Sequence, residues 1–250
     1  MLNDHVAWWQ RLHLGLREWR RRAKSSLPYV RRRVFRRLEQ RHDELAAVFL
    51  GGMPPATSAA VHRLKDLANP LAGEVCLFVT HAPSATLKPQ VVEHLAQLFE
   101  GGVQVLLVIN TDLPADAFDI DASLLARLSA CVLRENLGLD FAAWAHLRAL
   151  YAERLQPTRL WLVNDSIVGP LDATAYQRLL QRVRASQADM VGITENFDPR
   201  YHLQSFYLVF NEAALAPLYA VFDQLVNLPT KDLVIDVYET RLTQHLLDSG

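Results

Sequence analysis

The sequence has 250 residues, of which 50% are hydrophobic and 21% charged, so the chain can bury a sizeable core and is not a disordered polymer. Its apolar runs, such as VLLVI, fall far short of the roughly 20 residues that span a bilayer, and no signal-peptide pattern is present, which predicts a cytoplasmic protein. Cys76 and Cys131 are the only two cysteines, and each lies in an apolar run, so we expect buried thiols and no disulfide framework.

The net charge of −1 conceals an uneven distribution along the chain. Residues 1–45 hold 12 Lys and Arg against 5 Asp and Glu, a balance of +7, which leaves −8 for the rest. In this segment Arg and Lys clusters alternate with aromatic and aliphatic residues, and Pro28 divides two helical stretches. The pattern predicts two basic amphipathic helices.

Such helices suit three kinds of surface. Arg clusters with interfacial Trp fit an anionic membrane surface, and a basic helical face also fits packing against the rest of the protein. Nucleic acid is the third possibility, but the acidic remainder and the lack of any known reading motif argue against it, so no nucleic-acid partner is expected. Peripheral contact with the inner face of the cell membrane and structural packing both remain open.

Turn-forming residues occur next, in GGMPPATS (51–58) and LANPLAGE (67–74), and they bracket a stretch that we expect to be a short helix. We therefore predict a basic helical segment over residues 1–70 and a second domain over residues 71–250.

From Val75 onward, apolar runs alternate with amphipathic helical patterns. Strands are expected at 75–83, 103–112, 131–140, 159–166 and 188–194, and helices at 88–102, 121–130, 141–155 and 173–186. Apolar strands separated by helices indicate a mainly parallel sheet covered on both faces. The predicted fold class is therefore an α/β three-layer sandwich of Rossmann-like type.

Polar residues follow each expected strand: THAPS at 80–84, NTD at 110–112, RENLGLD at 134–140, NDS at 164–166 and TEN at 194–196. In open parallel sheets ligands bind outside the carboxyl ends of the strands, so these residues are the expected site. Common phosphate loops, a nucleophile elbow and the spacing of a zinc site are all absent from the sequence.

The triplet Asn164-Asp165-Ser166 is the main candidate for ligand chemistry. A carboxylate with an adjacent amide and hydroxyl offers hard oxygen ligands for Mg²⁺ or Mn²⁺ on a diphosphate. The same three residue types also begin turns and cap helices, so a purely structural role is the alternative.

Four motifs in order, RENLGLDFAAW, LWLVNDSIVGPL, ADMVGIT and HLQSFYLVF, resemble those of the rhamnan synthesis protein F family of bacterial polysaccharide synthesis. The resemblance extends over roughly Val75 to Gly250. It implies a GT-A-like glycosyltransferase, in which a strand-end Asp-x-Asp holds a metal ion on the diphosphate of a nucleotide-sugar donor. Because Asn164-Asp165-Ser166 supplies one carboxylate there, Asp165 is the implied metal ligand and catalytic residue, and metal dependence stays open.

The resemblance also implies contacts to the donor. Thr80 and His81 would border the base and ribose, Arg134 or Asn136 would reach phosphate or ribose, and Gly138 would permit a backbone approach or a positive φ. Asp140 would contact the sugar or cap the following helix. Further implied cofactor-binding residues are Asn164, Ser166, Gln204 and Ser205.

A general base for the acceptor hydroxyl is expected among the carboxylates after residue 194. Glu195 and Glu239 are the candidates, with Asp198 as a further one by position.

The resemblance thus implies transfer of a sugar, rhamnose being one candidate, from a dTDP-, UDP- or GDP-sugar to a glycan or lipid-linked saccharide acceptor. The alternative is a non-catalytic GT-A-like scaffold or glycan-binding protein of polysaccharide assembly, because the second carboxylate of the metal motif is missing.

Overall fold

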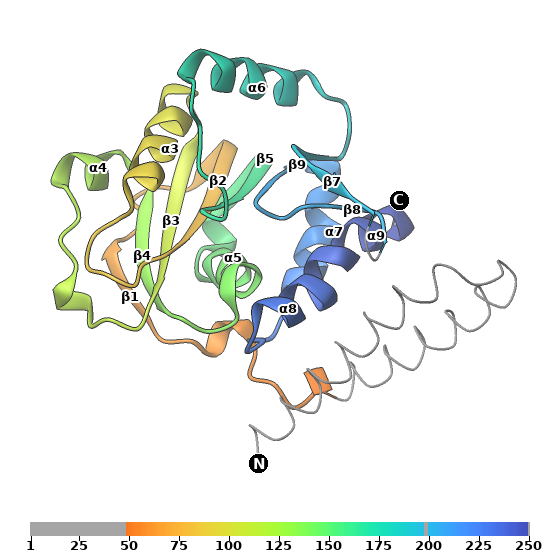
Figure 1. Cartoon of the computed structure of the whole chain (residues 1–250), viewed down its shortest axis with the longest axis horizontal. Coiled ribbons are helices and arrows are strands. Elements are labelled where there is room, and N and C mark those ends of the chain that lie inside the picture. The colour runs from red at the N-terminus through yellow and green to blue at the C-terminus, as the bar shows by residue number, and fades with distance from the viewer. Residues whose placement is uncertain (1–48, 198–199, 250) are drawn as a thin grey trace, which may run out of the picture. The chain divides into compact units, whose positions relative to one another are not determined.

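A seven-stranded β-sheet with helices on both faces forms the centre of the larger of two compact units, Met1–Pro54 and Pro55–Gly250 (Figure 1). The computed structural model describes residues 49–197 and 200–249. The two basic amphipathic helices predicted near the N-terminus lie outside the described residues, so they stay a prediction.

The elements of the larger unit are as follows. The sheet contains β1 (Val61–Lys65), β2 (Leu71–His81), β3 (Gln104–Thr111), β4 (Ala130–Glu135), β5 (Leu155–Asn164), β6 (Met190–Gly192) and β9 (Tyr207–Asn211), and β7 (Glu195–Asn196) pairs with β8 (His202–Leu203). The helices are α3 (Pro89–Glu100), α4 (Ala122–Arg127), α5 (Leu139–Leu150), α6 (Ala173–Ala185), α7 (Glu212–Phe222), α8 (Lys231–Val234) and α9 (Thr240–Ser249). Short 3₁₀ turns occur at Ala56–Ser58, Ala115–Ala117 and Ala152–Arg154, and a π-helical turn at Ile235–Glu239.

The strand order is β1-β4-β3-β2-β5-β9-β6. Strands β4, β3, β2 and β5 pair in parallel, while β1 and β9 are antiparallel to their neighbours. Because β6 is antiparallel to β9, it runs in the same direction as β5. All five strands predicted from Val75 onward are thus present and run one way, which confirms a mainly parallel sheet compatible with a Rossmann-like fold.

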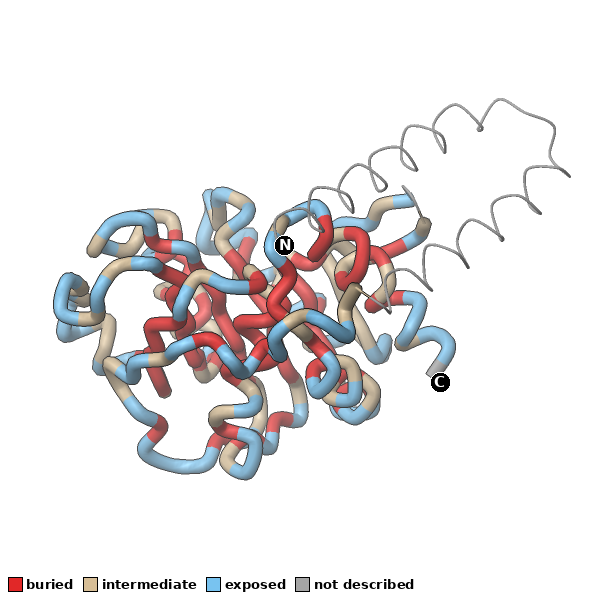
Figure 2. Tube along the Cα trace, turned by 90° about the horizontal axis from the view of Figure 1, so that it is seen from below, coloured by how far each residue is buried: buried red, intermediate tan, exposed pale blue. Residues whose placement is uncertain are grey.

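The two faces of the sheet bury different side chains, as the period-two alternation of a strand requires. Phe78 and Trp161 lie in one apolar cluster with Leu95 of α3 and Leu180 of α6. On the other face α5 packs against β2, where the Trp144 indole N–H donates to the Leu77 carbonyl at 2.8 Å, and α7 packs against β5 and β9. Figure 2 shows the buried residues gathered in the interior of the larger unit, with the exposed ones around them. Both cysteines are buried there and free, as expected.

The segment between the two turn regions is a strand, so the prediction of a short helix there was wrong. Val61–Lys65 forms β1 and pairs antiparallel with β4, Val61 opposite Arg134 and Lys65 opposite Cys131. The Lys65 ammonium donates to the carbonyls of Leu125, Ala126 and Leu128, which fixes the strand to the end of α4. The free edge of β4 therefore decides the conformation of a short segment whose own pattern is ambiguous, and residues 61–65 belong to the sheet rather than to a helical segment ending at residue 70.

Strand β9 brings a loop of the C-terminal region to the carboxyl edge of the sheet. It runs antiparallel to β5, so its first residue, Tyr207, pairs with Val163 near the end of β5. The Asn164 backbone N–H donates to the Phe206 carbonyl at 3.2 Å. Residues 204–206 consequently lie beside Asn164.

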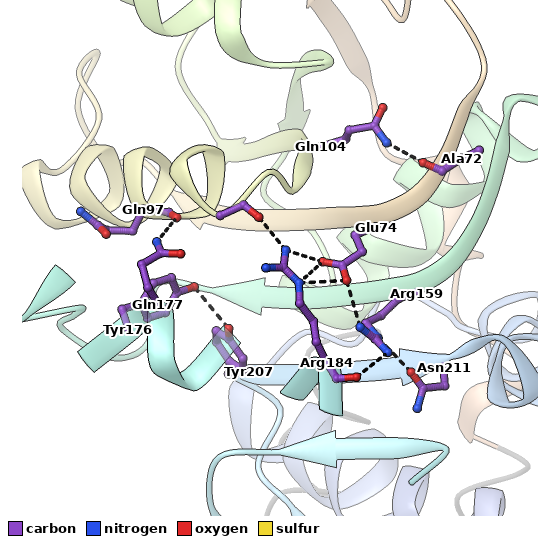
Figure 3. A network of polar contacts seen from close by, with 11 residues as sticks. Ala72, Glu74, Gln97, Gln104, Arg159, Tyr176, Gln177, Arg184, Tyr207 and Asn211 are labelled. Atoms are coloured by element: carbon purple, nitrogen blue, oxygen red, sulfur yellow. Dashed lines mark hydrogen bonds and ion pairs between the residues drawn. The ribbon is translucent and has the colours of Figure 1, made fainter. Parts of the chain in front are cut away.

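A polar network at the opposite part of the strands holds α6 on the sheet (Figure 3). Glu74 of β2 accepts from Arg159 of β5 at 2.9 Å and from Arg184 of α6 at 2.8 Å. Figure 3 also shows Arg159 donating to Asn211 of β9, at 2.9 Å. These half-buried charges compensate one another and link three strands and a helix, away from the carboxyl ends.

Within residues 49–197 and 200–249, the structure contains no helix that is both long and apolar enough to cross a membrane.

Candidate functional site

A cavity of about 620 Å³ lies at the carboxyl edge of the sheet. Its walls come from the ends of β2, β3 and β5, the start of α5, the loop before β9, and the α8 region with the π-helical turn. The lining residues are Val79, His81, Lys88, Asn110, Asn136, Leu139, Asp140, Asn164, Asp165, Ser166, Ile167, Gln204, Ser205, Phe206, Lys231, Val234, Ile235 and Glu239. The volume is in the range of small-molecule sites, and this edge is where open parallel sheets bind ligands.

Asp165, the first residue after β5, is held by two donors. The Thr80 hydroxyl, from the end of β2, donates to its Oδ2 at 2.6 Å, and the Lys88 ammonium lies 2.6 Å from the same oxygen. Only 14% of the Asp165 side chain is exposed, against 36% of Lys88. Lys88 is the residue that precedes the first turn of α3, so the start of that helix carries the charge to the cavity.

Asn164 links the Asp165 segment to the start of α5. Its amide Nδ2 donates to Asp140 Oδ2 at 2.7 Å, and its Oδ1 accepts from the Ser166 backbone N–H at 2.9 Å. The second bond closes an Asx turn, which orients the backbone on both sides of Asp165. The Asn164-Asp165-Ser166 triplet therefore forms a turn, the structural role that the sequence left open, and its three residues also line the cavity.

Asp140 is half-buried at the wall of the cavity, and its pKa is perturbed. Its pKa is raised from 3.8 to about 6, chiefly by burial and to a smaller extent by the negative charge of Glu239, while bonds from the Phe141 N–H at 3.0 Å and from Asn164 act in the opposite direction. Gly138, not Asp140, is the residue that caps α5. Asp140 is thus a carboxyl group in the first helical turn whose charge is costly to bury.

Glu239, in the π-helical turn, also lines the cavity. Its Oε2 accepts from the Ser205 backbone N–H at 3.0 Å and from the Ser205 hydroxyl, and its Oε1 lies 3.7 Å from His202 Nε2. The two Ser205 donors orient the carboxylate, and 13% of the Glu239 side chain remains exposed. Among the predicted bases, this residue lies at the cavity, whereas Glu195 is an exposed residue of β7 outside the lining and Asp198 is not described.

The donor set at Asp165 does not fit a protein-held divalent ion. Among the described residues no three His, Cys, Asp or Glu side chains gather as a metal-holding group. The single carboxylate of the triplet is already ion-paired with Lys88, and an ammonium at that distance repels a cation. Mg²⁺ and Mn²⁺ favour sets of oxygen ligands, which a lone neutralised carboxylate does not complete.

Arg134 lies away from the cavity, although the sequence predicts it as a phosphate or ribose contact. Its side chain is buried, and its guanidinium donates to the Asn227 Oδ1 at 2.8 Å, the Ala56 carbonyl at 3.0 Å and the Leu137 carbonyl. Burial lowers its pKa to about 10. All these partners belong to the protein, so Arg134 holds the loop before α5 and the segment before β1 in place.

Gly138 has the positive φ that was expected, 68°, and Leu139 after it has φ 57°. A Cβ on Gly138 would lie 2.5 Å from Ala142 Cβ and 2.8 Å from Asn227 Cα. Packing of α5 against the Asn227 segment therefore requires a glycine, and Gly138 does not line the cavity. Thr80 is likewise behind the wall, where it acts through Asp165.

The remaining predicted residues, His81, Asn136, Gln204 and Ser205, all line the cavity with Asn164 and Ser166. The sequence reasoning missed Lys88 and Lys231, whereas Asn110 lies in the expected NTD segment and does line the cavity. Lys88 and Lys231 each precede or begin a helix that follows a loop at the sheet edge, and that position was the available signal. Asn110 is the last but one residue of β3, and its Nδ2 donates to the Leu139 carbonyl at 3.1 Å.

Fold and cavity together define an α/β protein with a mostly parallel sheet and a polar ligand cavity at its carboxyl edge. The family model described as rhamnan synthesis protein F matches residues 105–250, more than half of the chain. The chain belongs to this family, which confirms the resemblance and implies a part in rhamnan polysaccharide synthesis. No curated protein matches the sequence. The matched residues include Asp140, Asp165 and Glu239, while Lys88 precedes them.

Proposed function

We propose that the protein is a GT-A-like glycosyltransferase that moves a sugar, rhamnose being the first candidate, from a dTDP-, UDP- or GDP-sugar to a bacterial surface polysaccharide or lipid-linked saccharide acceptor. Membership of a rhamnan synthesis family supports a polysaccharide as the product. The observation that carries the proposal is the polar cavity at the carboxyl edge, which Asp165, Lys88 and Glu239 all line.

The cavity offers the groups that glycosyl transfer needs. The leaving nucleoside diphosphate requires positive charge, and Lys88 and Lys231 supply it at the wall. An acceptor hydroxyl requires a base, and Glu239 is a carboxylate whose position is fixed by the two Ser205 donors. Asn136, Gln204 and Asn164 carry amides suited to the hydroxyls of a ribose or a sugar.

Titration of the protein with dTDP, UDP and GDP and with the corresponding sugar nucleotides, with and without Mn²⁺, tests this proposal. Binding of at least one of them, followed by donor turnover when an acceptor is present, is the expected result. Binding without hydrolysis or transfer would favour the alternative, a non-catalytic scaffold of polysaccharide assembly. No nucleotide binding in any condition would sink the transferase proposal.

We also propose that the basic N-terminal segment keeps the enzyme at the inner face of the cell membrane, where a lipid-linked acceptor lies. The +7 balance of residues 1–45 supports this, since polybasic segments gain about 1 kcal/mol per Lys or Arg near an anionic surface. Cosedimentation with anionic and neutral vesicles at low and high salt is the test. Salt-sensitive binding to the anionic vesicles is expected, and its absence would remove the membrane role.

A further inference from the structure

The Lys88–Asp165 pair is a charged contact at the cavity wall whose parts come from three elements. Lys88 precedes α3, Asp165 follows β5, and Thr80 at the end of β2 donates to the same Asp165 oxygen. Both charged side chains line the cavity. Asp165 is the more enclosed, at 14% exposed, and Lys88 is the more accessible, at 36%. The geometry therefore fixes the carboxylate in the wall and presents the ammonium to the cavity.

We propose that Lys88 is the group that neutralises the leaving diphosphate, without a protein-held metal ion, and that Asp165 and Thr80 are its positioning residues. The inference rests on the proposed function, because it names the charge that the proposed reaction needs. It gives the single carboxylate of the Asn164-Asp165-Ser166 triplet a role: Asp165 holds a lysine where a metal motif would hold a cation.

Although the lining also holds the carboxyl groups of Asp140, Asp165 and Glu239, the pairing of Asp165 with Lys88 favours the lysine over a metal ion. The cavity wall holds two lysines, Lys88 and Lys231, and Lys231 is exposed at the start of α8. The described residues contain no metal-holding group of three His, Cys, Asp or Glu side chains. Ammonium groups bind phosphate oxygens through short, charge-assisted hydrogen bonds, and lysine is a common phosphate ligand in proteins.

In the reaction, the bond between the sugar C1 and the β-phosphate oxygen of the donor breaks, and its electron pair stays on that oxygen. Lys88 donates a hydrogen bond to the oxygen as its charge develops, so the contact is stronger in the transition state than before it. The acceptor oxygen forms the new bond to C1, and its proton passes to the Glu239 carboxylate. Lys88 keeps its own proton throughout.

Calorimetric titration of the full chain with UDP, dTDP and GDP in excess EDTA measures how much Lys88 contributes to diphosphate affinity without a metal ion. Lys88→Gln keeps a hydrogen-bond donor for Asp165 but removes the charge, and Lys88→Arg keeps the charge. The matched control is Arg182→Ala, which removes an exposed positive charge of α6 outside the cavity lining. Thermal unfolding midpoints show whether each variant is folded, and uridine, thymidine and guanosine report on the base and ribose contacts alone.

The wild type should bind a nucleoside diphosphate in EDTA. Lys88→Gln should weaken that binding by about 10- to 100-fold, the range of a charged hydrogen bond, and leave nucleoside binding unchanged. Lys88→Arg and Arg182→Ala should stay within a few-fold of the wild type. Asp165→Asn is the second variant: it loosens the placement of Lys88 and should weaken diphosphate binding in EDTA, by less than Lys88→Gln does, whereas loss of a metal ligand would change nothing in EDTA.

Two results would overturn the inference while the proposed function stands. One is diphosphate binding that requires Mn²⁺ and vanishes in EDTA, and the other is binding in EDTA that Lys88→Gln leaves unchanged. Absence of nucleotide binding with and without Mn²⁺ would instead overturn the proposed function, and the inference with it.

Discussion

Replacing Asp140 by asparagine should make the protein more stable at neutral pH, and the size of the effect follows from its half-buried position and raised pKa. The folded state raises the Asp140 pKa from 3.8 to about 6, so it binds this proton more tightly than the unfolded state does. Stability therefore falls as pH rises between about 4 and 6, and above that window the cost is about 3 kcal/mol, at about 1.4 kcal/mol per pH unit.

Asparagine carries no charge, so the variant escapes this cost. It also loses one acceptor oxygen, because Asp140 now accepts from both Phe141 and Asn164, and a lost hydrogen bond costs about 1 kcal/mol. The net expectation is a gain of about 2 kcal/mol at pH 7.5, falling to zero or slightly below near pH 4, as the wild-type carboxyl is then protonated in the folded state.

Urea unfolding followed by circular dichroism at pH 7.5 and pH 4 measures both values. Asp116→Asn is the matched control, since Asp116 is exposed and its replacement removes the same charge from the surface. A stability difference for Asp140→Asn that is the same at both pH values, or a loss at pH 7.5, would refute the claim that burial of this charge is costly. A stabilised variant with lower transfer activity would further indicate that the charge is kept for the site.

Three further predictions concern the loop before α5, the Glu74 network and the proposed base Glu239. Gly138→Ala should lower the free energy of unfolding by about 2–4 kcal/mol in urea titrations, because the new Cβ meets Asn227 and the backbone has φ 68°; an unchanged midpoint would contradict the packing. Glu74→Ala should cost about 1–2 kcal/mol, discounted for partial exposure, because Arg184 loses its partner on the sheet, and a thermal melt unaffected by the change would argue against the network. Glu239→Gln should keep the folded midpoint and reduce kcat by about 10²–10⁴-fold in a donor-turnover assay; full activity would move the base elsewhere.

The strands could be predicted because their sequence pattern is strong. Fully buried runs such as that of β2, followed by polar residues, show both a strand and its carboxyl end, and parallel pairing brings those ends to one edge. Val79 pairs with Asn164 and His81 with Asn110, so residues far apart in sequence line the same cavity. The position of Asn164 and Asp165 at the site followed from this pattern alone.

The rest depended on contacts that a linear pattern does not contain. Arg134 and Glu135 are neighbours on β4, yet the first is buried among carbonyls and the second is exposed, because Glu135 is the last residue of a strand that is otherwise buried on both faces. Strand β1 forms since the edge of β4 is free to pair with it. Lys88 reaches Asp165 only when α3 is docked on the sheet, so its role could not be read from the residues around it.

The central claim, that this cavity is where a sugar leaves its nucleoside diphosphate, is tested most directly by measuring acceptor-dependent release of nucleoside diphosphate from a panel of sugar nucleotides. The wild type should release it, and Asp165→Ala, which loses the group that positions Lys88, should be slower by about 100-fold or more at an unchanged folded midpoint. Equal release by Asp165→Ala and the wild type would contradict the account.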